Sequence, residues 1–161
     1  MARPFNKERP VSLLAKLLLG LALLLLPPLV VAQNNLGELL DAGARKLSGE
    51  EFRQDVVQHT IVGTTASGQR LELMYATSGV IQGRSEANAA GTNIGAGINI
   101  LSALDGAWTI DESGKICASM VIQRVILPFR CQYWFKYKDD YFIADSDSDR
   151  SAKVLRRTVK Q

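Results

Sequence analysis

Residues 106–143 read GAWTIDESGKICASMVIQRVILPFRCQYWFKYKDDYFI and hold both cysteines and both tryptophans of the chain. Apolar and polar residues alternate within this stretch, over 115–122 and again over 131–137. Alternation with a period of two is typical of half-buried β-strands. Short turn-forming runs at 111–114 and 138–140 separate the alternating segments. The stretch therefore predicts the antiparallel centre of a small β domain.

Residues 1–32 have the organisation of a secretory signal peptide. A basic N-terminal region precedes the apolar run LLLGLALLLL at 17–26, and Val30 and Ala32 fit the small-residue pattern of a cleavage site before Gln33. The alternative is an uncleaved anchor helix, but ten residues at about 1.5 Å each span only about half of a bilayer core. We expect a periplasmic or secreted protein, cleaved between Ala32 and Gln33, that meets the membrane only through this leader.

Removal of the leader changes the charge of the chain. The full sequence has 19 basic and 16 acidic residues, and the leader takes four of the basic residues and one of the acidic ones. The remaining 129 residues carry 15 of each and are close to neutral. A near-neutral chain argues against nucleic acid as a partner, since binding it requires a basic surface. A chain of this length can bury one hydrophobic core.

Cys117 and Cys131 predict a structural disulfide, because paired cysteines persist in exported proteins. A bridge that closes a loop of about 15 residues contributes on the order of 3 kcal/mol to stability. The alternative is a reactive dithiol. The spacing of fourteen residues differs from Cys-x-x-Cys, and both cysteines lie in strand-like segments, so the bridge is favoured.

A helix over 49–58 has clear signals at its start. Ser48 is suited to the N-cap, and Glu51 stands three residues later, which together predict a capping box. Leu47 and Phe52 occupy the two positions of a hydrophobic staple. The helix is short, so it is expected to pack on or plug a larger structure.

The expected domains are a signal peptide at 1–32, an N-terminal segment at 33–46 with a helix over 36–46, and a β-barrel-like domain at 47–161. The expected strands are 60–65, 70–76, 80–83, 106–110, 115–122, 131–137, 141–144 and 152–159. Seven to nine short strands with tight turns favour a mainly β (α+β) fold, an antiparallel meander closed or nearly closed into a small barrel and preceded by two short helices.

Two segments interrupt this pattern. Pro128, within 123–129, predicts a bulge, a break or an edge position. Residues 84–105 are small, polar and glycine-rich in their first half, and 98–104 suggests an irregular strand. This segment is interpreted either as a functional loop or as a mobile linker.

The aromatic residues of 131–137 have two interpretations. In the first, Tyr133, Phe135 and Tyr137 fill the barrel interior. On that assignment Trp134 shares the opposite face with Lys136, which predicts partial exposure. This core interpretation is the favoured one.

In the second interpretation, some of the aromatic residues bind a ligand. Trp108, Tyr133, Trp134 and Tyr137 would line the mouth of a pocket beneath the 84–105 loop. Aromatic bodies with polar tips suit a small ligand at such a mouth. These four residues are the candidate ligand-binding residues.

Asp145, Asp147 and Asp149 have the spacing of carboxylates in a calcium loop. However, Arg150 stands at the sixth position in place of the glycine, and Arg156 at the twelfth in place of the glutamate. A solvated turn is therefore favoured over a metal site, and the three aspartates remain weak calcium candidates.

No other motif predicts a cofactor or a catalytic residue. His59 is the only histidine, which excludes a multi-histidine zinc site, and its place at a helix-to-strand junction predicts a surface or capping role. The run GTNIGAG at 91–97 lacks the lysine of a P-loop. The adjacent acid pairs lie at a helix start and in turns, where carboxylates are ordinarily solvated.

The order of several short motifs resembles that of a group of small secreted proteobacterial proteins of unknown function. The motifs are LSGEEFRQ, IVGTTASGQRLELMYATSGVIQG, GAWTIDESGKIC, a second cysteine and YKDDYFIADSDSDR, and the match covers most of residues 47–146. The resemblance implies a lipocalin-like or half-barrel β fold in the periplasm of a bacterium. It carries no catalytic residues.

Three hypotheses for function follow. The first is a non-enzymatic binding module for a small apolar ligand or a partner protein. The second is a structural or inhibitory envelope protein that acts through its surface, with an exposed apolar patch around Trp134. The third is a hydrolase that uses carboxylates alone, which would require a buried Asp or Glu with a raised pKa. The absence of a nucleophile–base pair in the sequence favours the first hypothesis.

Overall fold

Strands dominate the part of the chain that the computed structural model describes, residues 33–86, 101–122 and 125–160. Two helices lie within it, α2 (Leu36–Asp41) and α3 (Gly49–Asp55). The strands are β1 (Arg45–Lys46), β2 (Thr60–Thr64), β3 (Arg70–Tyr75), β4 (Val80–Glu86), β5 (Leu101–Ile110), β6 (Ile116–Ile122), β7 (Val125–Tyr137), β8 (Asp140–Ala144) and β9 (Leu155–Lys160).

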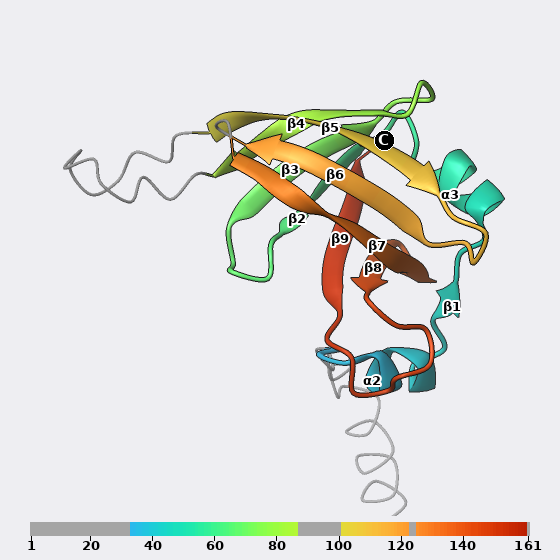
Figure 1. The fold of residues 1–161 in the computed structure, drawn as a ribbon. Coiled ribbons are helices and arrows are strands. Elements are labelled where there is room, and N and C mark those ends of the chain that lie inside the picture. Colours follow the sequence, from blue (N-terminus) through green and yellow to red (C-terminus); the bar gives the residue numbers. More distant parts are fainter. Residues whose placement is uncertain (1–32, 87–100, 123–124, 161) are drawn as a thin grey trace, which may run out of the picture. The chain divides into compact units, whose positions relative to one another are not determined.

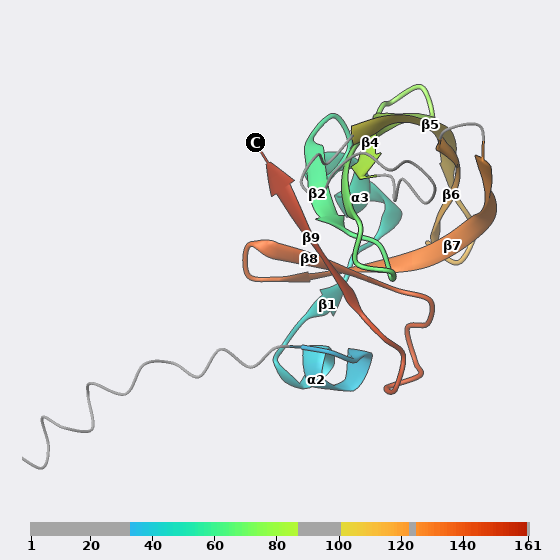
Figure 2. The same cartoon turned by 90° about the vertical axis from the view of Figure 1, so that its left-hand side faces the viewer.

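The strands β2 to β9 close into an antiparallel barrel (Figures 1 and 2). The order around the barrel is β7, β6, β5, β4, β3, β2, β9, β8, and the pairing of β8 with β7 completes the ring. The short strand β1 pairs with β7 beside the barrel. The prediction of an antiparallel barrel with two short helices at its start is confirmed.

Strand β7 is long because it pairs with β6 over one part of its length and with β8 over the other. Its first part, up to Gln132, pairs with β6, and its last part, from Tyr133, pairs with β8. Ala118 lies opposite Arg130 and Met120 opposite Leu127, so β7 holds one extra residue next to Pro128. A bulge accommodates the missing N–H of proline and bends the strand, as the sequence predicts for this segment.

Cys117 and Cys131 lie directly opposite each other on β6 and β7, with 3.8 Å between their Cα atoms. They form the disulfide that the sequence predicts. The bridge therefore joins two strands that are already neighbours in the barrel wall.

Two glycines allow neighbouring strands to approach closely in this curved wall. A Cβ atom on Gly83 of β4 would lie 2.1 Å from the carbonyl oxygen of Glu72 on β3. A Cβ atom on Gly106 of β5 would lie 2.2 Å from the carbonyl oxygen of Ser119 on β6. Glycine inside a strand commonly marks such a bend, where another backbone comes close.

Helix α3 closes one end of the barrel (Figures 1 and 2). Its start has the predicted capping box, in which Ser48 accepts from the Glu51 amide and the Glu51 carboxylate accepts from the Ser48 amide. Both staple residues, Leu47 and Phe52, are buried in the main core. The ring of Phe52 lies 5.1 Å from that of Trp134, so the helix fills the barrel end with an aromatic side chain.

A second, smaller core lies on the outer side of the barrel wall. There α2 packs on the hairpin of β7 and β8. The side chains buried in this core are Leu36, Leu39, Phe135, Phe142, Ala144 and Val154. The segment 33–46 therefore covers one face of the barrel with apolar residues of its own.

The predicted orientation of β7 is wrong. Trp134 is only 4% exposed and belongs to the barrel core, whereas Phe135 lies in the outer core beneath α2, with Tyr133 and Tyr137 packed against it. Alternation shows that these residues divide between two faces, but not which face is inside. Here both faces are covered, so the aromatic residues fill both cores.

The predicted irregularity of 84–105 is also wrong at both ends of that segment. Strand β4 continues to Glu86 and β5 begins at Leu101, and the two pair in regular register. Ser85 of β4 and Ser102 of β5 are both buried. Each strand therefore has a polar residue at a buried position where alternation predicts an apolar one. Residues 87–100, which include the GTNIGAG run, lie outside the described part of the chain.

Both predicted helices end early. Helix α2 ends at Asp41, and Gly43 takes a positive φ of 95° two residues later. Helix α3 ends at Asp55, and Gln58 has a positive φ of 68°. Positive φ values end helices, which accounts for the shorter lengths. Within the described ranges, no helix is long and apolar enough to cross a membrane.

Candidate functional site

The structure divides the four predicted ligand-binding residues into two pairs. Trp108 and Trp134 lie inside the barrel, each with its ring edge-on to Phe52. Tyr133 and Tyr137 lie on the opposite face of β7, and each has a lysine ammonium group about 5 Å from its ring centre. The barrel wall separates the pairs, so the four residues do not line one pocket.

The three weak calcium candidates have separate partners. Asp145 accepts a hydrogen bond from the Gln132 amide, at 2.8 Å. Asp147 forms an ion pair with Lys46 at 2.7 Å, and Asp149 accepts from the amide and hydroxyl of Ser151. The hydrogen bond from Lys46 lowers the pKa of Asp147, and those from Ser151 lower the pKa of Asp149. Each carboxylate is thus neutralised or hydrogen-bonded locally.

One grouping of metal-ligand types occurs in the part of the chain that the structure describes, namely Asp111, Cys117 and Cys131. Both sulfur atoms of this group are in the disulfide. Zinc and similar metals bind cysteine as thiolate, so this grouping is not suited to hold them.

The main candidate site is a cavity of about 590 Å³ at the barrel end that α3 covers. Three parts of the chain build it: the last turn of α3 with His59, the hairpin of β7 and β8, and strand β9. The lining residues are Gln54, Asp55, His59, Lys136, Asp139, Tyr141 and Val159. All but the last are polar, in contrast to the aromatic core deeper in the barrel.

A hydrogen-bonded group of three side chains organises the cavity wall. The Asp55 Oδ2 atom accepts from the Lys136 ammonium group at 2.6 Å and from the Tyr141 hydroxyl at 3.1 Å. The hydrogen bond from Lys136 is the main cause of the lowered pKa of Asp55. The hydrogen bond from Tyr141 lowers this pKa further, whereas partial burial acts in the opposite direction. The same contact raises the pKa of Lys136, while burial raises that of Tyr141. At neutral pH the group therefore holds one carboxylate, one ammonium and one neutral hydroxyl.

Asp139 and His59 complete the polar lining. Asp139 makes no hydrogen bond or ion pair with any residue that the structure describes, so its carboxylate is free to accept. His59 is half-buried in the cavity wall, and its Nδ1 atom is enclosed without a hydrogen-bond partner among the described residues. The sequence predicts a surface or capping role for His59 and does not indicate the cavity.

The arrangement can bind polar groups, and no raised carboxyl pKa is resolved among the described residues. Every carboxyl group of the described residues for which a pKa shift is resolved has its pKa lowered, not raised. A general acid that works near neutral pH requires the opposite shift. The raised carboxyl pKa that the hydrolase hypothesis requires is thus not found in the described part of the chain.

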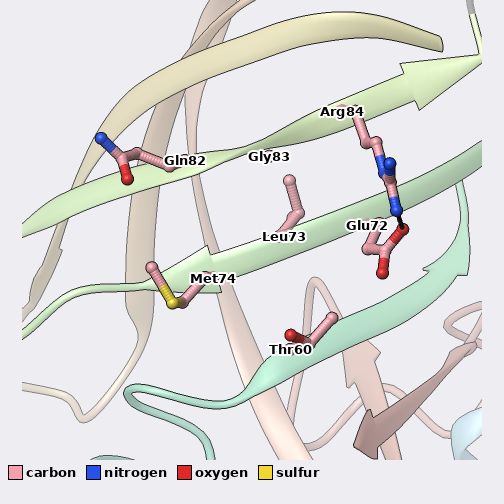
Figure 3. A pocket seen from close by; sticks show the side chains of 7 residues that line it. All are labelled: Thr60, Glu72, Leu73, Met74, Gln82, Gly83 and Arg84. Atoms are coloured by element: carbon pink, nitrogen blue, oxygen red, sulfur yellow. Dashed lines mark hydrogen bonds and ion pairs between the residues drawn. The ribbon is translucent and has the colours of Figure 1, made fainter.

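A second, shallow hollow of about 330 Å³ lies on the outer face of β2, β3 and β4. Figure 3 shows the Arg84 guanidinium turned toward the Glu72 carboxylate along one side, with Met74 and Gln82 at the other. Arg84 and Glu72 form an ion pair at 2.7 Å. Because the charged groups of this hollow neutralise each other on an open surface, the end cavity is the better candidate site.

The chain matches no protein-family model, no curated protein and no solved structure. These comparisons therefore assign it to no family, enzymatic or otherwise. The similarity to small secreted proteobacterial proteins stays a prediction from the sequence motifs.

Proposed function

We propose that this protein is an exported, non-enzymatic binding module whose end cavity holds a small polar molecule. The observation that carries the proposal is the cavity of about 590 Å³ lined by the hydrogen-bonded group Asp55, Lys136 and Tyr141. Pockets of roughly 300–1,000 Å³ with a few convergent polar groups are typical of small-molecule sites.

The filling of the barrel favours a polar ligand over the apolar ligand that the aromatic residues suggested. Phe52, from α3, lies among Tyr75, Trp108 and Trp134, with ring centres 5.1–5.5 Å apart. An apolar ligand in the barrel would have to displace this helix. The end cavity requires no such displacement.

The chemistry of the lining indicates a ligand rich in N–H or O–H donors. Lys136 is already hydrogen-bonded to Asp55, which leaves the Asp139 carboxylate, the second Asp55 oxygen and the Gln54 carbonyl as free acceptors among the described residues. Amino and hydroxyl groups of a small molecule match these acceptors.

Two features support the proposal that the protein is exported, namely the leader sequence at 1–32 and the disulfide. The Cys117–Cys131 bridge is compatible with a location outside the cytoplasm, where disulfides persist. We propose the periplasm or the extracellular space as the place where the ligand is bound.

Native mass spectrometry of protein purified from its own compartment, followed by titration of a panel of amines and sugars, tests the proposed function. We expect a bound small molecule, and Asp139→Asn should weaken its binding about tenfold or more, because it removes the charge of a free carboxylate acceptor in the cavity. Asp149→Asn is the matched control, because Asp149 is exposed, does not line the cavity and accepts hydrogen bonds from Ser151. Equal binding by both variants, or protein that binds nothing, would contradict the proposal.

A partner protein is a second candidate, and it is favoured by one specific observation. Ile126 is 77% exposed and Phe129 60% exposed, and Val121 lies beside Ile126 on the outer face of β6 and β7. This surface replaces the patch around Trp134, which is buried. If the protein acts through this surface, Ile126→Ser with Phe129→Ser should abolish recovery of a specific envelope partner without lowering the free energy of unfolding.

A further inference from the structure

Most of the exposed large apolar side chains lie on one hairpin, which β6 and β7 form. Four such side chains occur in the described part of the chain, and three of them belong to this hairpin. Ile126 is 77% exposed, Phe129 60% and Val121 39%. Val121 and Ile126 are direct cross-strand partners, and Phe129 follows beside Pro128. Exposed apolar side chains are thus concentrated toward the tip of the hairpin.

The tip of this hairpin lies at the end of the barrel away from α3. Strand β6 ends at Ile122 and β7 begins at Val125, and Figure 1 shows both of these ends on the side of the barrel opposite α3. Neither buried core of the described residues contains Val121, Ile126 or Phe129. These side chains are therefore available to a partner outside the molecule.

The sequence around the hairpin has only positive charges. Residues 113–138, which include both strands, take five of the fifteen basic residues in 33–161 and none of the fifteen acidic ones. The Arg130 side chain, next to Phe129, is exposed and makes no ion pair or hydrogen bond with another described residue. A free cation therefore accompanies the apolar side chains, in a chain that is close to neutral without its leader.

We propose that the β6–β7 hairpin docks the protein on a membrane surface that contains anionic lipids. Ile126, Phe129 and Val121 enter the boundary between headgroups and acyl chains, and the Arg130 guanidinium binds lipid phosphates. Apolar insertion and electrostatic attraction add in such binding, and each cation near an anionic surface strengthens it about fivefold. The sequence predicts membrane contact through the leader alone, so this surface is a further contact. It is separate from the end cavity and does not depend on a ligand there.

A lipid surface matches these features better than a protein does. A specific protein interface buries roughly 800 Å² on each partner and requires a complementary shape. A membrane requires only a few apolar side chains together with nearby cations. A second copy of this chain would bring the free Arg130 of each copy into one interface, where like charges repel.

Cosedimentation with vesicles tests the proposal, and it compares mixed phosphatidylglycerol and phosphatidylcholine with phosphatidylcholine alone. All variants are purified from their own compartment in the same way, so that any contribution of residues 1–32 is equal among them. We expect binding to the anionic vesicles that weakens as sodium chloride is raised, because salt screens exposed charges. Absence of binding, or equal binding to both kinds of vesicle, would overturn the proposal.

Substitutions on the hairpin separate its two contributions. Ile126→Ser with Phe129→Ser should weaken binding to anionic vesicles about tenfold or more, because it removes the inserted side chains. Val80→Ser is the matched control, since Val80 is 41% exposed but lies on β4. Arg130→Gln should weaken the same binding about fivefold, whereas Lys153→Gln, at an exposed position outside the hairpin, should not. Equal losses in the hairpin variants and their controls would contradict the assignment to this surface.

Phe129→Trp measures insertion directly. On vesicles with brominated acyl chains its fluorescence should be quenched, whereas the unaltered protein should show little quenching, because Trp108 and Trp134 belong to the barrel core. Bound protein without this additional quenching would refute insertion of the hairpin. Recovery of an envelope protein without vesicle binding would overturn the lipid assignment in favour of the partner protein.

Discussion

Trp134 and Phe135 are adjacent in the chain, yet their rings are buried in two different cores. Each is almost completely enclosed, Trp134 by the barrel interior and Phe135 by the underside of α2. The outcome for each side chain depends on what covers its face of the strand. The same holds for Lys136, which shares a face with Trp134 but reaches the Asp55 carboxylate at the cavity.

The Asp55–Lys136 pair should make stability depend on pH at both extremes. The pKa of Asp55 is lower in the folded state, so its contribution is present above the unfolded value of about 3.9 and is lost as the pH falls through the folded pKa. The pKa of Lys136 is raised, so its contribution is present below about 10.4 and is lost as the pH rises through the folded pKa.

Urea denaturation across pH checks this prediction. Between about pH 5 and pH 2 the free energy of unfolding should fall more steeply for the unaltered protein than for Asp55→Asn. Lys136→Met is the matched variant, because it removes the main cause of the lowered pKa and should flatten the acid side as well. Parallel acid profiles of all three proteins would show that the pair does not contribute.

At the level of the element, α3 is held by its packing more than by its own helix signals. It spans only Gly49–Asp55, and helices this short are marginal in isolation. The capping box fixes where it begins, while Phe52 is fully buried among three aromatic rings. The sequence predicts the capping box and the inward position of Phe52. It does not show which aromatic rings surround Phe52.

Two substitutions in α3 should separate these contributions. Ser48→Ala removes the N-cap and should lower the free energy of unfolding by about 1 kcal/mol. Phe52→Ala leaves a cavity among the rings and should lower it by about 3–5 kcal/mol. Chemical denaturation measures both, with the exposed Glu50→Ala as control, for which a change within about 0.5 kcal/mol is expected. A larger loss from Ser48→Ala than from Phe52→Ala would refute this account.

At the level of the whole molecule, β9 closes the barrel. It pairs with β2 on one side and with β8 on the other, so it joins the start of the barrel to its end. It also contributes Val159 to the end cavity and Arg157 to the interior. The cavity and the interior charge both depend on this closure.

A chain that ends at Val154 should therefore not fold cooperatively. Without β9 the strands β2 and β8 would each present an unpaired edge, and the core would lose one wall. Circular dichroism during urea denaturation should show a broad change without a sigmoidal transition. A sharp transition in the truncated chain would mean that the barrel does not require its last strand.

The sequence by itself determined the features that arise from neighbouring residues. These include the cap at Ser48, the hairpins of the meander, an irregularity near Pro128 and, because the chain has only two cysteines, the disulfide. It also determined the class of fold. Short strands that alternate between apolar and polar residues must bury their apolar face, and a barrel or a sandwich achieves this.

Only the tertiary structure decided which face of β7 points inward and which side chains meet. Asp55 contacts Lys136 and Tyr141, which lie 81 and 86 residues further along the chain. Alternation has the same period on either face, and it carries no information about which distant strands become neighbours. The end cavity and the buried position of Arg157 therefore arise from barrel closure, which brings β2, β7, β8 and β9 around the end of α3.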